Sequence, residues 1–242
     1  MPESVANLPL LHRPRSWRPR AQVWLCVAAT LVAFPALAHN VSATDGNFIE
    51  AVRGVAIGPF MYLGAKHMVT GVDHLLYLVG VVFFLARPRD VVLYVTLFTL
   101  GHSLTLVIGV LSGLTVNAYL IDAVIGFSIV YKAFENMGGF DRTGVAIDTR
   151  AAVFVFGLCH GMGLAGKLAG FAMDEEGLVA NIVSFNVGVE AGQIVALVFI
   201  LLLLLRWRES EAFGRHAFGA NTVLMTGGFM LVGFQLTGYV TS

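Results

Sequence analysis

The sequence predicts an all-α protein, a polytopic membrane helical bundle with about six transmembrane helices after a cleaved signal peptide. Hydrophobic residues make up 57% of the 242-residue chain, and charged residues only 12%. Together with a mean hydropathy of +0.79, this composition is typical of helices that lie in lipid. The formal net charge is zero, so charge gives no argument for a nucleic-acid partner. We therefore expect the lipid bilayer to be a main partner, and no nucleic acid.

The N-terminal 38 residues have the layout of a secretory signal peptide. An apolar stretch from about residue 21 to residue 34 is followed by Pro35 and the small-residue pattern Ala36-Leu37-Ala38. An uncleaved first span is the alternative, but the apolar core is short for a span. We predict that residues 1–38 are removed, which would make His39 the new N-terminus. Whether His39 then binds a metal ion is left open. The basic residues that precede the apolar stretch are Arg13, Arg15, Arg18 and Arg20.

The mature chain divides into two parts. Residues 39–66 are mixed in polarity and end in an apolar patch that is too short to span a membrane, which predicts an external N-terminal arm with an interfacial helix. Residues 67–242 form the predicted transmembrane helical domain, because they hold six apolar runs of roughly 18 residues or more. The predicted spans are approximately 67–86, 91–112, 118–138, 151–172, 179–205 and 219–240.

The basic residues of the short loops predict the orientation. Most of them fall on one side of the predicted spans, and the positive-inside rule places that side in the cytoplasm. The mature N- and C-termini are then both outside, as a cleaved signal peptide also requires. We expect a multi-pass protein of the bacterial inner membrane. The arginines on the predicted cytoplasmic side are Arg87, Arg89, Arg142, Arg150, Arg206, Arg208 and Arg215.

Ionisable side chains recur within the predicted spans, although charged groups are costly inside a bilayer. The first span opens with His-Met-Val-Thr-Gly-Val-Asp-His, residues 67–74. At a rise of about 1.5 Å per residue from the outer end of each span, the later groups fall in one layer between the outer half and the midplane. These groups are Asp73, His74, His102, His160 and Glu190.

Imidazoles and carboxylates at one depth predict a site for a divalent transition-metal ion. Neutral imidazole suits Ni, Zn, Cu and Fe, whereas Mg and Ca prefer oxygen ligands. The alternative is that each histidine is a hydrogen-bonded packing residue, and that the residues of the first span only cap a helix at the interface. The predicted metal ligands are His67, Asp73, His74, His102, His160 and Glu190.

A second group of polar residues is predicted to line a pathway or to support the ligands. It comprises Thr99, Ser103, Glu135 and Asn136. For Glu135 the alternative is a local ion pair with Lys132, three residues earlier on the same predicted helix. Two further ionisable residues, Asp122 and Lys167, lie toward outer span ends and are expected to be interfacial.

Four segments of the sequence form a recognisable set: Gly-Ala-Lys-His-Met-Val-Thr-Gly-Val-Asp-His-Leu-Leu-Tyr-Leu, Phe-Thr-Leu-Gly-His-Ser-Leu-Thr-Leu, Ser-Ile-Val-Tyr-Lys-Ala-Phe-Glu-Asn and Phe-Gly-Leu-Cys-His-Gly-Met-Gly-Leu-Ala. Together they resemble the HupE/UreJ family of hydrogenase/urease accessory membrane proteins. The resemblance runs from about Gly64 to Gly238 and implies a nickel-linked role with histidine ligands. The residues that it carries onto the family pattern are His67, Asp73, His74, His102, Glu135 and His160.

Three functions fit these observations. The first is a permease for a divalent transition metal, with nickel the first choice and zinc, copper or cobalt as alternatives. The second is an intramembrane metal-dependent hydrolase in which Ser103 or Glu190 would assist. The third is a metal-handling or assembly subunit that works with other membrane or metalloenzyme-maturation proteins. We expect a transporter or accessory protein rather than an enzyme and assign no catalytic residue. No G-x-x-x-x-G-K-[ST] loop is present, so transport driven by ATP would need another protein.

Overall fold

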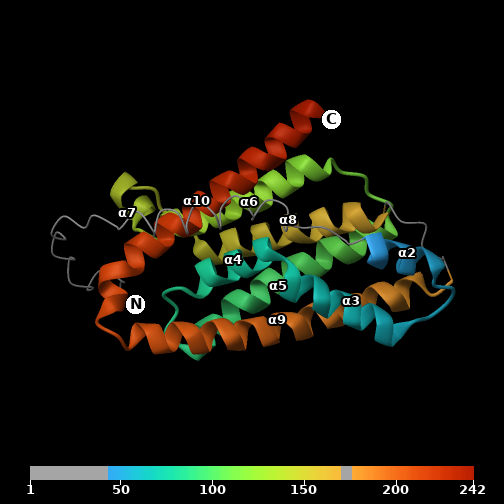
Figure 1. Ribbon diagram of the computed structural model, residues 1–242, viewed down its shortest axis with the longest axis horizontal. Coiled ribbons are helices and arrows are strands. Elements are labelled where there is room, and N and C mark those ends of the chain that lie inside the picture. The colour runs from blue at the N-terminus through green and yellow to red at the C-terminus, as the bar shows by residue number, and fades with distance from the viewer. Residues whose placement is uncertain (1–42, 170–175) are drawn as a thin grey trace.

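The structure is a computed structural model that describes residues 43–169 and 176–242. Within these two ranges every regular element is a helix, so the all-α prediction is confirmed. The predicted signal peptide lies outside the described residues. Figure 1 shows α6 and α10 running together along one side of an elongated bundle, with α9 along the opposite side. The helices are α2 (Ala43–Ala51), α3 (Ile57–Thr70), α4 (Val72–Val82), α5 (Pro88–Leu111), α6 (Ala118–Asn136), α7 (Gly139–Thr143), α8 (Thr149–Ala169), α9 (Leu178–Arg208) and α10 (Ala212–Thr241).

Four helices are long and apolar enough to cross a membrane, namely α5, α8, α9 and α10. They correspond to four of the six predicted spans, and their ends differ from the predicted ends by several residues. Helix α6 corresponds to a fifth predicted span. It has 19 residues but carries Asp122, Lys132 and Glu135 within that length. The structure therefore supports a membrane protein, while six crossings stay a prediction.

The single helix predicted for residues 67–86 is wrong, because the chain breaks at Gly71. This residue has an extended backbone, with φ −71° and ψ 99°, and it separates α3 from α4. A Cβ atom at this position would lie 2.9 Å from the carbonyl oxygen of His67 and 3.1 Å from Nδ1 of His74. Glycine therefore lets the end of α3 and the start of α4 approach each other. The predicted boundary at residue 66 also falls inside α3 rather than between two elements.

Three helix pairs make up most of the packing: α3 with α9, α5 with α8, and α6 with α10. Glycines let these backbones touch, as small residues do in membrane bundles. A methyl group at Gly161 of α8 would overlap the carbonyl oxygen of His102 on α5, and one at Gly188 of α9 would overlap that of Met61 on α3. The close spacing between α5 and α8 brings His102 and His160 to the same level.

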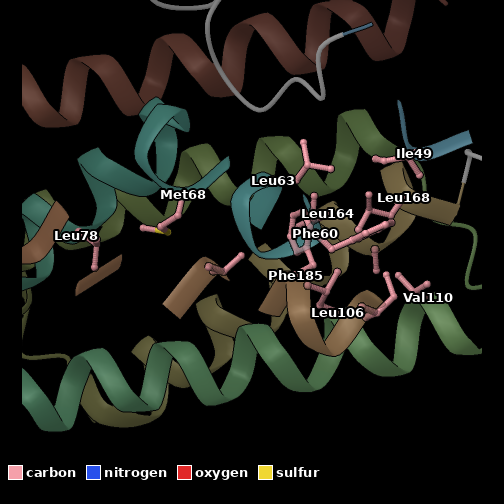
Figure 2. Packing of buried hydrophobic residues seen from close by; sticks show 13 residues of the cluster. Ile49, Phe60, Leu63, Met68, Leu78, Leu106, Val110, Leu164, Leu168 and Phe185 are labelled. Carbon is pink, nitrogen blue, oxygen red and sulfur yellow. The ribbon is translucent and has the colours of Figure 1, made fainter. Parts of the chain in front are cut away.

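Two buried apolar clusters flank this level. The first contains Leu106 of α5 and Leu164 of α8, together with Phe60 and Phe185 from α3 and α9, and it is shown in Figure 2. The second contains Phe98 of α5 among residues nearer the other end of the bundle. Because Leu106 and Phe98 each lie one helical turn from His102, polar groups at this level have apolar packing on both sides.

Candidate functional site

Histidines from three other helices pack around His74 of α4. The ring centroid of His74 lies 5.2 Å from that of His67 on α3, 5.8 Å from that of His102 on α5 and 5.0 Å from that of His160 on α8. His74 and His160 are fully buried, and His102 is 1% exposed, whereas His67 is partly buried. We call these four residues the histidine layer. The sequence predicted a shared depth, and the structure adds that the other three rings pack edge to face with that of His74.

Asp73 orients His74. Its Oδ1 atom accepts hydrogen bonds from the backbone N–H of His74 at 2.9 Å and from the ring Nδ1 at 3.1 Å. Because a carboxylate only accepts, Nδ1 carries the ring proton and Nε2 carries the lone pair. A carboxylate that holds Nδ1 in this way is a common support for a metal-binding imidazole. Asp73 itself is 2% exposed, so the pair is shielded from solvent.

His160 is oriented in the same sense by the backbone of its own helix. Its Nδ1 lies 2.8 Å from the carbonyl oxygen of Phe156, and since a carbonyl only accepts, Nδ1 donates and Nε2 carries the lone pair. Nε2 of His160 and both ring nitrogens of His102 are buried without a hydrogen-bond partner in the described part of the chain. Buried polar atoms usually have partners, so these nitrogens fit the chemistry of a ligand-binding group.

Aromatic rings pack against the histidine layer on the side that faces the turn between α4 and α5. Tyr77 lies 5.2 Å from His160 between ring centroids, and Phe98 lies 5.0 Å from His160 and 6.2 Å from His102. They keep the imidazoles in contact with a low-dielectric environment, in which interactions with a cation are stronger than in water.

Asp122, near the start of α6, and Lys167, near the end of α8, form a largely buried ion pair beside the histidine layer. Their expected position at the membrane interface stays a prediction. Nζ of Lys167 lies 2.8 Å from Oδ2 of Asp122, and the two side chains are 17% and 7% exposed. Both charges interact electrostatically with His74. The signal that could have revealed the pair is its opposite charge at matching depth on consecutive predicted spans.

Glu190 does not join the histidine layer. Its side chain is exposed on α9, on a helix whose Gly188 and Gly192 face α3. The direction in which this side chain points could not be obtained by counting residues along α9.

The four predicted pathway residues divide between two places. Thr99 donates to Oε1 of Gln193 at 2.9 Å, and the buried hydroxyl of Ser103 has no hydrogen-bond partner in the described ranges; both residues lie on α5 near His102. Glu135 and Asn136 lie at the C-terminal end of α6. Asn136 donates to the carbonyl oxygen of Gly80 at 2.8 Å.

Glu135 takes part in a polar cluster at this end of α6. It accepts from Nζ of Lys132 at 2.7 Å and from the hydroxyl of Thr149. The local ion pair with Lys132, considered as an alternative from the sequence, is therefore present. Asn136 extends the cluster by donating to Oδ1 of Asn221 at 2.9 Å. Six residues of α4 separate His74 from Gly80, a rise of about 9 Å, so this cluster is distinct from the histidine layer.

In the part of the chain that the structure describes, no three His, Cys, Asp or Glu residues are grouped so that they could hold a metal ion as they stand. The imidazoles are nevertheless near the required spacing. Two imidazoles that bind one ion through metal–nitrogen bonds of about 2.0–2.1 Å have ring centroids roughly 5 Å apart. The separation of His74 and His160 is 5.0 Å. The spacing of this pair is compatible with a shared ion, which would also require the ring nitrogens to point to one position.

The four long apolar helices define the class as a membrane protein. A family model described as HupE / UreJ protein matches residues 43–242. The chain therefore belongs to the HupE/UreJ family, which is associated with uptake of nickel or cobalt or with accessory roles. No curated protein and no solved structure matches the chain.

Proposed function

We propose that this chain carries a divalent transition-metal ion, with nickel as the first candidate, across the bacterial inner membrane through the histidine layer. The observation that supports this most strongly is the gathering of imidazoles from four helices around His74. Membership in the HupE/UreJ family supports the same class of cargo. Zinc, copper and cobalt suit the same donors and are the alternative cargoes.

The cargo would bind through Nε2 atoms. Hydrogen bonds from Nδ1 to Asp73 and to the Phe156 carbonyl leave the lone pairs of His74 and His160 on Nε2. His102 and His67 would complete the shell after small ring rotations. A shell that is assembled by rotation binds the ion only moderately, and moderate binding allows release, which a transport site needs.

The polar cluster around Glu135 and Asn136 would form the exit for the ion on the cytoplasmic side. Asn136 contacts Gly80, which lies about two helical turns beyond His74 on α4. Glu135 and Asn136 are at the end of α6 that precedes Arg142 of α7. The carboxylate of Glu135 would attract the departing cation, and Lys132 would balance its charge once the cation has left. Thr99 and Ser103 would support the histidine layer from α5.

The orientation that we propose has the arginine-bearing turns in the cytoplasm and both mature termini outside. Hydrogen bonds hold two of these turns together: Arg208 donates to the carbonyl oxygens of Val82, Phe83 and Leu85. At the same end, Thr149 at the start of α8 contacts Glu135 near the end of α6. These contacts support a single basic end of the bundle.

An accessory role would use the same metal site. The chain would then pass its ion to another membrane or metalloenzyme-maturation protein rather than release it. The hydrolase alternative has less support, because Glu190, one of the two residues that would assist, is exposed and outside the histidine layer.

The test is uptake of Ni²⁺ into proteoliposomes that contain the purified full chain, together with elemental analysis of the protein. His102→Ala removes a buried imidazole, and we expect bound nickel and uptake to fall about tenfold or more. His216→Ala is the matched control, because His216 is exposed on α10, and it should behave like the wild type. Unchanged uptake in His102→Ala would contradict the proposal. A wild-type protein that retains its metal and moves none would favour the enzyme or accessory function.

A further inference from the structure

The ion pair of Asp122 and Lys167 lies on the outer side of the histidine layer. Helix α8 runs from the basic end, near Thr149, toward the outer end. Lys167 is seven residues beyond His160 on this helix, which places the two side chains on the same face. His67 also interacts electrostatically with Lys167. A cation that reaches the histidine layer from outside would therefore meet this pair.

The Asp122 carboxylate has only one of its two oxygens engaged. Oδ2 accepts from Lys167 at 2.8 Å and lies 3.5 Å from Nε2 of Gln235. Oδ1 is buried and has no hydrogen-bond partner within the described ranges, although the residue is only 7% exposed. A buried carboxylate oxygen without a partner is costly. It is also a suitable ligand atom for a divalent cation.

Gly163 keeps the space beside Oδ1 clear of a side chain. A Cβ atom at Gly163 would lie 3.5 Å from Oδ1 of Asp122 and only 3.0 Å from Cδ1 of Ile125. Gly163 is three residues after His160, so it shares the face of α8 that carries the imidazole. Oδ1 therefore faces α8 within one helical turn of His160.

Stability alone is a weak reason for such a pair. Taking two charges out of water is expensive, and apolar residues of similar volume often serve the fold as well as a buried ion pair does. The pair of Lys66 with Asp45 has the same 2.8 Å length but lies nearer the surface, with side chains 37% and 19% exposed. A lysine–carboxylate pair of this length therefore also forms in this chain where solvent reaches it, at a lower cost of desolvation.

We propose that the Asp122 carboxylate is the outer entry site for the divalent cation, and that Lys167 is a tethered cation that occupies this site until the metal ion displaces it. This inference rests on the proposed function. Lys167 balances the carboxylate when no metal is bound. An incoming ion of higher charge takes its place on Asp122 and is then one helical turn from Nε2 of His160. Lys167 would thus set how tightly the entry site holds the ion.

The test is titration of the detergent-solubilised full chain with NiCl₂, followed by calorimetry. Lys167→Gln keeps a hydrogen-bond donor for Asp122 but removes the competing charge, so Ni²⁺ should bind about tenfold more tightly. Asp122→Asn should weaken binding by about the same factor, because the ion loses an anionic ligand. Lys167→Met is a second variant that removes the donor as well. Arg89→Gln, which removes an exposed cation that pairs with Asp90 at the start of α5, is the matched control and should leave the affinity unchanged.

Size-exclusion chromatography checks that each variant is folded. Unchanged or weaker Ni²⁺ binding in the folded Lys167 variants would overturn the inference. If His102→Ala abolishes binding in the same experiment, the proposed function stands and only the entry site fails. If neither the wild type nor Lys167→Gln binds Ni²⁺, both proposals fail.

Discussion

At the scale of single residues, Asp73 has a more specific position than its spacing suggested. The sequence predicted it as one of several possible ligands. In the structure its Oδ1 accepts two hydrogen bonds from His74, one from the backbone and one from the ring. The same carboxylate therefore stabilises the first turn of α4, where an acidic group is favourable, and fixes the ring proton of His74 on Nδ1. We infer that Asp73 positions an imidazole rather than binding the cargo by itself.

Asp73→Asn tests this positioning role. An amide is neutral and can present its NH₂ group to Nδ1, so the lone pair of His74 would no longer be fixed on Nε2. We expect Ni²⁺ affinity to fall by about 10–100-fold, the range for loss of a group that supports a metal ligand. Calorimetric titration measures the change, and Asp141→Asn, at an exposed position in α7, is the control. Equal affinities for Asp73→Asn and wild type would show that the contact serves only the helix end.

Counting residues along each span predicted which histidines lie at one level, but not the direction in which each side chain points. His74, His102 and His160 were expected at one level, and the structure brings their rings together. The same count placed Glu190 there, but its side chain is exposed. Asp122 was expected near an outer span end, and the count did not reveal that its side chain is buried in the bundle. Which side of a helix faces its neighbours depends on the pairing of helices, and hydropathy carries little information on that when all faces of a span are apolar.

At the scale of elements, the contact between α5 and α8 sets the distance across the histidine layer. Gly161 lies against the backbone of His102, and Gly157 lies against the backbone of Phe98. The Gly157/Gly161 spacing predicted a close helix contact from the sequence, but not its partner. Because His160 is adjacent to Gly161, a wider spacing between these helices would also move the two imidazoles apart.

Gly161→Ala should therefore affect stability and metal binding together. The added methyl group overlaps the His102 carbonyl, and overpacking of this kind costs roughly 1–3 kcal/mol. We expect a lower unfolding midpoint in a denaturant titration and weaker Ni²⁺ binding in the protein that remains folded. Gly233→Ala is the control, because a Cβ at Gly233 meets nothing within 4 Å. Loss of stability with unchanged Ni²⁺ affinity would separate the glycine contact from the metal site.

The break between α3 and α4 was beyond what the sequence could predict. Residues 67–74 mix polar and apolar side chains, but the whole stretch 67–86 is apolar on average, and a hydropathy criterion therefore favours one helix. A single glycine in a helical pattern is usually tolerated. What ends α3 is the local arrangement at Gly71, whose N–H donates to the His67 carbonyl at 2.8 Å while Asp73 bonds the start of the next helix.

At the scale of the whole molecule, the arginine-bearing turns gather at one end of the bundle. Arg208 at the end of α9 donates to backbone carbonyls that follow α4. The opposite end is tied by Asn181 of α9, which bonds the backbone of Gly54 and Ala56 just before α3. The loops that the sequence assigned to one side of the membrane are thus on one side of the fold. The orientation relative to the cell remains a prediction.

Cysteine labelling in intact cells tests that orientation. Single cysteines placed near Arg87, Gly144 and Ser210, in a Cys159→Ala background, should resist an impermeant thiol reagent and react only after the cells are opened. A cysteine at Gly113, in the turn after α5 at the opposite end, should react in intact cells. The reverse pattern would invert the orientation, and mixed labelling of the first three sites would contradict a single cytoplasmic end.

The one-residue interruption at Gly71 divides the proposed metal site between two helices, so the affinity for the ion would depend on the angle between α3 and α4. Helix α3 packs mainly on α9, whereas α4 packs mainly on α6. His67 and His74 belong to these two different bodies and have ring centroids 5.2 Å apart. An ion that binds both imidazoles would fix the angle between α3 and α4. A contact that favours the same angle would raise the affinity for the ion, and the ion would strengthen that contact by the same factor. Lipid thickness or a partner protein pressing on α9 could therefore set metal affinity without touching a ligand.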